Sequence, residues 1–279
     1  MTKTKTSSKP RRARLLTAAL WTLALGITLV SAVWQRMTGP TYPVTGTVNL
    51  GGEQVQLKLD RTHGGPGDQP VVLTVPDLFV SGQVAWRRYP TNDEWQTIDL
   101  VRNGDRLEAA LPHQPPAGKL EYQVRLLRAE GRTRETVFFP PRPAITRFKG
   151  DVSAAVLIPH ILAMFLGMLW STRAGLEALA RGERQKRLAI SAFVLLAVGG
   201  FVLGPIVQNM AFGDWWTGFP FGYDLTDNKT LIAGLAWVWA LWRLKGRESA
   251  RSSVLIASLV TLVVFAIPHS AWGSEIKWE

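Results

Sequence analysis

The sequence predicts an α-helical membrane protein of five spans, with an all-β sandwich inserted between the first and second spans. Three observations support this fold class. Hydrophobic residues make up 47% of the chain and charged residues only 19%. The apolar residues gather into runs of membrane length. The stretch 41–149 instead consists of short alternating segments separated by turn residues, which is typical of β-strands.

The five predicted spans differ in length. Residues 15–33, 152–171 and 188–207 each hold roughly 20 residues without a charge, enough to cross a ~30 Å hydrocarbon core at ~1.5 Å per residue. Residues 231–242 and 254–268 are shorter, and we expect them to span as well. A 12-residue span would be only ~18 Å long. We therefore expect the fourth span either to continue through Leu244 or to draw the residues before it toward the membrane.

Basic residues are concentrated in alternate connections between these spans. Lysines and arginines precede the first span, follow the second from Arg173 on, and follow the fourth from Arg243 on. The positive-inside rule then places the N-terminus in the cytoplasm and the segment 41–149 outside. The net charge of +11 therefore indicates topology, and we do not expect a nucleic-acid partner.

These predictions divide the chain into three parts. Residues 1–40 are a basic cytoplasmic tail with the first anchor, residues 41–149 an outer β domain, and residues 150–279 a four-span membrane domain. A basic start followed by Ser31 and Ala32 also fits a cleaved signal peptide, but the apolar run exceeds the ~7–15 residues of such a peptide, so we predict an uncleaved anchor. The chain has no cysteine, which excludes disulfides and thiolate metal sites.

The outer segment contains eight predicted strands. Glycine- and proline-rich turns separate them, and this number of short strands in ~110 residues indicates a β-sandwich. His63 and His113 fall in the turns, and we interpret them as surface residues. The predicted strands are residues 44–50, 53–59, 71–75, 83–88, 96–101, 106–111, 120–127 and 132–139.

This segment also resembles immunoglobulin-like and fibronectin type III-like modules. The resemblance lies in Val84-Ala85-Trp86-Arg87-Arg88-Tyr89, Trp95, Ala110-Leu111-Pro112, Pro115-Pro116-Ala117-Gly118 and Glu121-Tyr122-Gln123-Val124. It implies an immunoglobulin-like sandwich and leaves function open. The chain as a whole is similar to bacterial membrane proteins, which implies a multi-pass location in the inner (plasma) membrane, with the β domain and the C-terminus in the periplasm.

The second span carries the first candidate site. His160, Met164 and Met168 recur at four-residue spacing, so they share one helix face. An ionisable residue within a span is costly and is a functional candidate by default. The alternative is structural, with the histidine bonded to a neighbouring helix and the methionines filling gaps.

The stretch 212–229, FGDWWTGFPFGYDLTDNK, is the centre of the second candidate site. Trp215, Trp216 and Phe219 are typical of an interfacial aromatic belt, or they cover a pocket. Asp224 and Asp227 precede the fourth span, where Asp227 or the neighbouring Thr226 is a candidate helix N-cap. The outer loop as a whole covers residues 208–230.

The order of His160, this tryptophan-rich loop and His269 resembles the WWD-type haem-handling proteins of cytochrome c assembly. The matching residues are Phe212-Gly213, Trp216, Asp224, Asn228 and Leu231-Ile232. The chain departs from that family at Phe212, where the family has tryptophan, in an extra Gly-Phe-Pro-Phe-Gly within 217–223, and in its smaller number of spans. The resemblance implies haem b with His160 and His269 as axial ligands beneath the aromatic loop.

Three functions therefore stay open. The first is a non-catalytic accessory or assembly role in a membrane complex, in which the β domain binds a protein partner and the spans contact lipid. The second is haem b binding or handling by His160 and His269, in an outer pocket roofed by Trp215, Trp216 and Phe219. The third is a copper or zinc site formed by His160, Met164 and Met168 with His269 or Asp224, since thioethers favour Cu(I).

Overall fold

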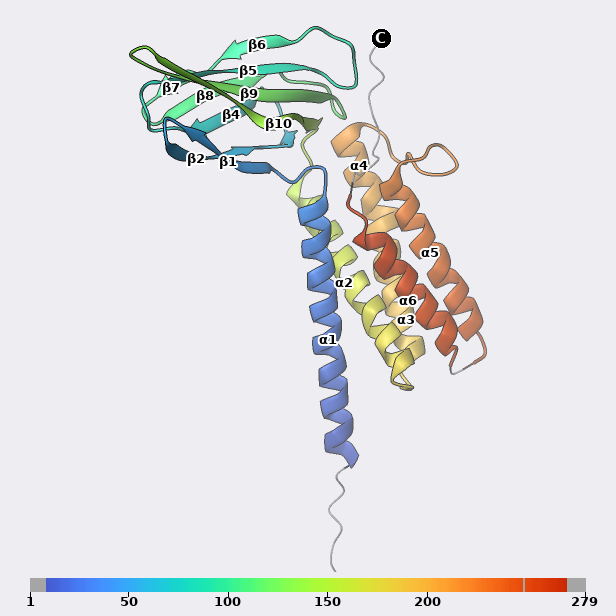
Figure 1. Ribbon diagram of the computed structural model, residues 1–279. Helices are drawn as coiled ribbons and strands as arrows, with labels where there is room; N and C mark the ends of the chain where they lie inside the picture. The colour runs from blue at the N-terminus through green and yellow to red at the C-terminus, as the bar shows by residue number, and fades with distance from the viewer. Residues whose placement is uncertain (1–8, 248, 270–279) are drawn as a thin grey trace, which may run out of the picture. The chain divides into compact units, whose positions relative to one another are not determined.

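The computed structural model describes residues 9–247 and 249–269, and it divides into two compact units. The first unit contains the N-terminal helix, Ser153–Val207 and the residues from Trp215 onward. The second unit contains the strands of Gly39–Val152 together with Gln208–Asp214. Figure 1 labels most of the elements of both units.

Helices form the first unit. Three helical segments are long and apolar enough to cross a membrane: Arg11–Thr38, Ala154–Leu179 and Gln185–Phe212. The chain is therefore a membrane protein with a mixed helix and β-sheet fold. The helical elements are α1 (Lys9–Thr38), α2 (Ala154–Leu179), α3 (Gln185–Leu196), the π-helical η1 (Ala197–Leu203), α4 (Gly204–Phe212), α5 (Leu225–Leu244) and α6 (Arg251–Ala266).

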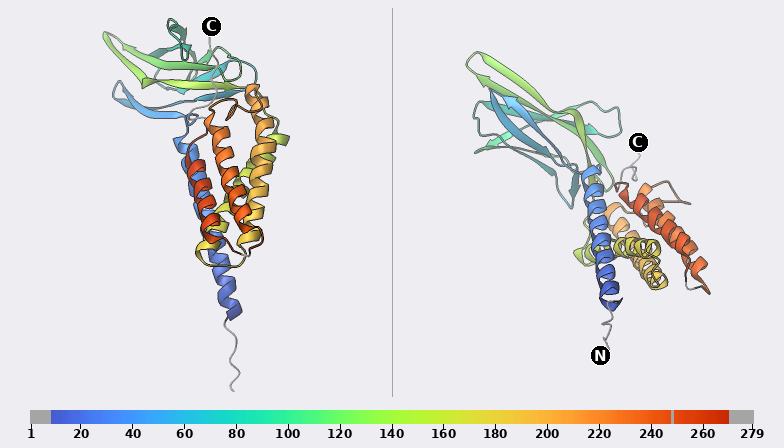
Figure 2. Two further views of the ribbon diagram at one scale, coloured as in Figure 1. Left: turned by 90° about the vertical axis from the view of Figure 1, so that its right-hand side faces the viewer. Right: turned by 60° about the horizontal axis from the view of Figure 1, so that its bottom comes forward.

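The helices of this unit pack side by side (Figure 2). Helix α2 contacts α1, α3 and α6, while α5 contacts α3 and α6. Small residues allow these approaches: a Cβ at Gly167 would lie 2.9 Å from a methyl carbon of Leu196, and one at Gly234 would lie 2.7 Å from the ring of Phe201. Close packing at small residues is the usual way in which membrane helices associate.

The last two helices differ from their predicted extents. Helix α5 has 20 residues, so it is ~30 Å long and extends beyond the predicted range at both ends, through Leu244. Helix α6 has 16 residues and ends at Ala266. It is apolar but shorter than the three candidate spans. Pro268 lies beyond its end and so cannot kink it.

The third candidate span is continuous from α3 through η1 to α4 but widens at η1. The N–H of Gly204 reaches the carbonyl of Gly199, five residues earlier. Pro205 follows, and because it has no N–H it cannot donate to a carbonyl one turn back. A π-helical turn of this kind is rare and is found mostly as a local bulge at functional sites. The helix therefore widens at Gly199 and Gly200.

Ten strands form the described part of the second unit, where the sequence predicts eight. Three predicted strands are reproduced without change, as β1, β2 and β8. The strands are β1 (Val44–Leu50), β2 (Glu53–Leu59), β3 (Thr62–Gly64), β4 (Gln69–Thr74), β5 (Val80–Arg88), β6 (Gln96–Asp99), β7 (Val101–Asn103), β8 (Arg106–Leu111), β9 (Lys119–Glu130) and β10 (Thr133–Lys149).

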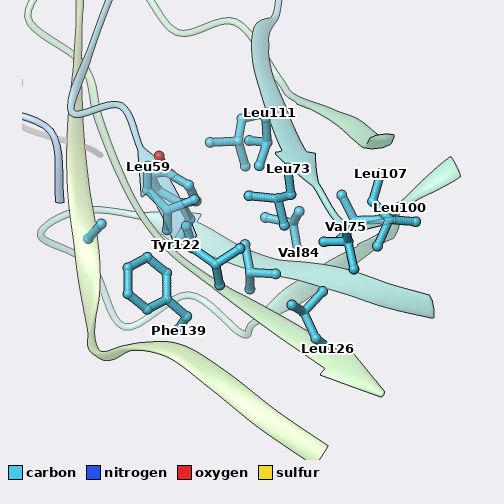
Figure 3. Packing of buried hydrophobic residues seen from close by; sticks show 14 of the residues in the cluster. Leu59, Leu73, Val75, Val84, Leu100, Leu107, Leu111, Tyr122, Leu126 and Phe139 are labelled. Atoms are coloured by element: carbon cyan, nitrogen blue, oxygen red, sulfur yellow. The ribbon is translucent and has the colours of Figure 1, made fainter. Parts of the chain in front are cut away.

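The strands form three sheets around one hydrophobic core. The sheet orders are β1-β2, β3-β10-β9-β5-β6 and β4-β8-β7. Alternate residues of β4 and β9 are buried, as expected where one face of a sheet is covered. Leu73, Val84, Leu107 and Leu126 meet in this core (Figure 3). The core lies wholly within the second unit, so it stabilises that unit without disulfides.

The largest difference between a predicted and an observed strand is in β10. The sequence predicts a strand that ends at Phe139, before Pro140-Pro141-Arg142-Pro143. The structure continues to Lys149, because a register shift between Phe139 and Ala144 takes up the prolines. A bulge removes residues from the ladder, and proline, which cannot donate to it, is tolerated there. Beyond the bulge β10 pairs with β3 in parallel.

Candidate functional site

His160 lies on α2 and is hydrogen-bonded to the π-helical turn. Its Nδ1 is 2.9 Å from the carbonyl oxygen of Gly199, the same oxygen that accepts the N–H of Gly204. A carbonyl can only accept, so Nδ1 carries the hydrogen and donates. In the neutral ring Nε2 then keeps its lone pair, which is the arrangement that metal-binding histidines adopt.

The two methionines predicted to share this face have different surroundings. A Cβ at Gly199 would lie 2.8 Å from the sulfur of Met164, so Met164 lies against the same turn as His160. Met168 is buried in the hydrophobic core of the helices, as gap-filling methionines commonly are. Among residues 9–247 and 249–269, no group of three or more His, Cys, Asp or Glu side chains is arranged to hold a metal ion.

His269 follows the end of α6 in a turn and is exposed. It lies after its helix and not within it. Lys229, on α5, donates to the carbonyl oxygens of Ile267 and Pro268, the two residues before His269.

Lys229 is a buried residue that the sequence does not predict as part of a site. It is only 1% exposed, and its Nζ donates to the carbonyl oxygens of Ile267 at 2.7 Å and Pro268 at 3.2 Å. The side chain of Gln35 donates to the carbonyl of Phe265 at 2.7 Å. The last carbonyls of a helix have no partners within the helix, so these side chains satisfy them and a cation is favourable there.

The tryptophan-rich loop is held to the first turn of α5 by two side chains. The carboxylate of Asp227 accepts the backbone N–H groups of Thr217 at 2.6 Å and Gly218 at 3.0 Å. The side-chain oxygen of Asn228 accepts the N–H of Phe219 at 2.8 Å. Because Asp227 is buried, these contacts fix the loop along three successive residues.

Asp224 is the N-cap of α5, and the expectation that Thr226 or Asp227 has this role was wrong. The carboxylate of Asp224 accepts the N–H of Thr226 at 2.7 Å. Its own N–H donates to the carbonyl of Thr217 at 3.0 Å, which closes the base of the loop. The helix begins earlier than predicted, so the N-cap is Asp224 and not Asp227. Asp227 lies in the first turn of the helix and binds the loop.

The aromatic residues of the loop separate into two sets. Trp216 stacks on Phe201 of η1, with ring centroids 6.0 Å apart, and its Nε1 donates to the carbonyl of Phe219 at 3.1 Å. The side chains of Trp215 and Phe219 are 60% and 64% exposed. Trp216 therefore packs on η1, the segment whose Gly199 carbonyl binds His160.

Phe212 and Gly213, which contribute to the resemblance to haem-handling proteins, lie in the second unit. The guanidinium of Arg147 lies 4.0 Å from the ring centroid of Phe212, and the N–H of Gly150 donates to the carbonyl of Ala211 at 2.9 Å. These residues therefore pack against the end of β10.

A buried ion pair lies on α2, outside both predicted sites. Arg173 is 1% exposed and is 2.7 Å from the carboxylate of Glu177 one turn later. The other Glu177 oxygen accepts the N–H of Arg184 at 3.1 Å, and the ring of Trp21 lies 5.5 Å from the Arg173 guanidinium. The predicted second span ends at residue 171, which places both residues in the connection after it. The i, i+4 spacing was the signal that could have identified the pair.

No family model, curated protein or solved structure matches this chain.

Proposed function

We propose that this protein is an integral inner-membrane protein of five spans with an immunoglobulin-like periplasmic domain, and that it binds a protein partner as an accessory subunit of a membrane complex. The observation that carries the proposal is the tryptophan-rich loop. Its backbone is fixed by Asp227 and Asn228, yet it presents exposed aromatic rings. The exposed rings are Trp215, Phe219, Phe221 and Tyr223.

A fixed loop with exposed rings suits recognition of another surface. Grouped exposed apolar side chains mark interaction sites, and aromatic residues are enriched in the energetically important centres of protein interfaces. A preorganised loop also loses less conformational entropy when it binds. The same rings would suit a membrane–water interface, so the experiment must distinguish protein from lipid.

Site-specific photocrosslinking in membranes makes that distinction. A benzophenone amino acid at Phe221, which is 82% exposed, should give a discrete crosslinked protein band that mass spectrometry identifies. The same probe at Val198, exposed on η1, is the control and should label lipid. Labelling of lipid alone at Phe221 would refute the partner-binding role.

The topology is tested separately with reporter fusions. A fusion at Asn103 in the β domain should report a periplasmic location, and one at Gly182, between α2 and α3, a cytoplasmic location. Both follow from the distribution of basic residues. A cytoplasmic report at Asn103 would overturn the orientation. A fusion at Gly246 should report the cytoplasm if α5 and α6 both span.

Haem b binding is the second candidate, and the hydrogen bond of His160 favours it. A haem-ligating histidine binds iron through one ring nitrogen while the other donates to a carbonyl or carboxylate. His160 meets this requirement because Nδ1 donates to Gly199. His160 and His269 would hold the iron, and haem would supply an electron-transfer centre. The copper or zinc alternative has less support, because Met168 is buried in the core.

Absorption spectroscopy of the detergent-purified protein tests the haem candidate. A Soret band that His160→Ala abolishes, and that His269→Ala converts from a six-coordinate to a five-coordinate form, would support it. Purified protein that shows no Soret band after incubation with haemin would exclude it.

A further inference from the structure

We propose that the β domain carries a binding site for a neutral oligosaccharide, in a pocket at the β5–β6 end of its five-stranded sheet. This site lies apart from the aromatic loop and the histidines, and it does not depend on the proposed function. The pocket has a volume of about 460 Å³, which lies within the ~300–1,000 Å³ typical of small-molecule sites.

Two tryptophans give the pocket its aromatic surface. Trp86 on β5 and Trp95 just before β6 both line it, and Trp95 is 42% exposed. The guanidinium of Arg87 lies 4.8 Å from the Trp95 ring centroid, which fixes the ring in place. The face of an aromatic ring is electronegative, so it attracts the weakly positive C–H groups on the flat side of a sugar ring.

Three of the charged residues that line the pocket, Arg87, Arg88 and Asp93, are in ion pairs. Arg88 binds Asp93 through two nitrogens at 2.6 and 3.3 Å, and Arg87 binds Glu121 at 2.5 Å. The hydrogen bond from Arg88 lowers the pKa of Asp93 and the bond to Asp93 raises the pKa of Arg88. Both therefore stay ionised and neutralise each other. An anionic ligand would have to compete with these carboxylates, which favours a ligand without charge.

The remaining polar groups suit hydroxyl groups. Glu94, Gln96 and Gln114 line the pocket and offer carboxylate and amide groups, which accept and donate hydrogen bonds in a plane. Trp86 is packed partly against the hydrophobic core of the β domain, which holds its side chain in place at the pocket wall. Aromatic surface combined with planar polar groups is the chemistry that a sugar needs, with its apolar C–H face and polar edge.

The loop that carries these residues is ordered by its own contacts. The hydroxyl of Thr91 donates to the carbonyl of Arg88 at 2.7 Å and accepts the N–H of Asp93 at 3.2 Å. The guanidinium of Arg87 also approaches the carbonyl of Asp93 at 3.4 Å. The pocket is therefore formed before a ligand arrives, which reduces the entropy lost on binding.

Tryptophan fluorescence of the full-length protein tests the proposal. The protein should be purified in lauryldimethylamine oxide, because maltoside and glucoside detergents carry sugar head groups that would compete. The probes are maltotetraose, cellotetraose and chitotetraose, with a heparin tetrasaccharide as the anionic comparison. At least one neutral sugar should change the fluorescence saturably. The heparin fragment should not.

Variants locate the site. Trp95→Ala should weaken binding of that sugar by about tenfold or more, because the stacking surface is lost. Glu94→Gln, on an exposed residue, should weaken it less and serves as a second variant if Trp95→Ala is poorly folded. Phe138→Ala removes an exposed ring from the same domain, outside the pocket, and should bind as the unaltered protein does. Binding of heparin alone, binding of no probe, or equal binding by all three variants would overturn the proposal.

Discussion

Replacement of Asp227 by alanine should release the tryptophan-rich loop while leaving the helices intact. The Asp227 carboxylate accepts two backbone N–H groups, from Thr217 at 2.6 Å and Gly218 at 3.0 Å, and a third contact from the Thr217 hydroxyl at 3.2 Å. Alanine can accept none of them. The N–H groups of Thr217 and Gly218 would then have to hydrogen-bond to water.

The size of the effect follows from the number and kind of these bonds. A hydrogen bond to a charged group contributes about 1.5–3 kcal/mol, so the two backbone bonds amount to about 3–6 kcal/mol of local stability. Because 1.4 kcal/mol corresponds to a factor of ten, hydrogen exchange of the Thr217 and Gly218 amides should accelerate by about 10²- to 10⁴-fold. Asn228→Ala is the matched control. It removes one neutral bond, to Phe219, and should accelerate exchange at Phe219 by about tenfold or less.

Hydrogen exchange followed by mass spectrometry, in detergent or nanodiscs, measures this difference peptide by peptide. Peptides from α2 should exchange at the same rate in all variants, because opening of the loop is local. Asp227→Asn should fall between the alanine variant and the unaltered protein, since one acceptor oxygen remains without the charge. Loop exchange that changes less than about twofold in Asp227→Ala, or a larger effect from Asn228→Ala, would refute the assignment of Asp227 as the main loop anchor.

Three further predictions concern buried polar groups. Glu177→Gln should lower the free energy of unfolding by about 3–5 kcal/mol because Arg173 loses its counter-charge. The double variant Arg173→Met/Glu177→Leu should recover most of that stability. If the single and the double variant lose the same stability in thermal unfolding, the ion-pair interpretation is wrong. Thr261→Val should cost about 1–3 kcal/mol, because the buried Nε1 of Trp237, which donates to Thr261 at 2.9 Å, loses its acceptor; Thr261→Ser should not. Burial raises the pKa of Tyr122 above that of tyrosine in the unfolded chain, which is ~10. The stability that the protonated Tyr122 gives the β domain is therefore complete below pH ~10 and is lost as the pH rises above that value. Tyr122→Phe should remove that alkaline loss in urea titrations at several pH values, and an unchanged pH dependence would exclude Tyr122 as its source.

The sequence by itself predicted the helices and strands that a pattern in consecutive residues marks. Apolar runs predicted three spans that the structure places at Arg11–Thr38, Ala154–Leu179 and Gln185–Phe212, because a bilayer imposes a length that residue counting can measure. Alternation of apolar and polar residues predicted β1 and β2 to the residue. Both signals lie in consecutive residues of a single helix or a single strand.

The pairing of His160 with His269 is a prediction from their positions in two spans and from the resemblance to haem-handling proteins. The sequence could not predict the tautomer of His160, which depends on a π-helical turn at Gly199. Nor did it identify Lys229, because the carbonyls that Lys229 satisfies belong to the end of another helix, 38 residues later. Helix ends need partners, but which side chain supplies them is decided by packing.

The same limit applies to the β domain. The prolines after Phe139 predicted the end of a strand, and only the pairing of β10 with β9 and β3 shows that the chain resumes its ladder beyond them. Likewise, Trp86 and Trp95 were visible as part of an immunoglobulin-like pattern, but their convergence with Gln114 on one pocket requires β5, β6 and the segment after β8 to meet. Contacts between residues distant in sequence are set by the whole packed core, and so the tertiary structure alone decides them.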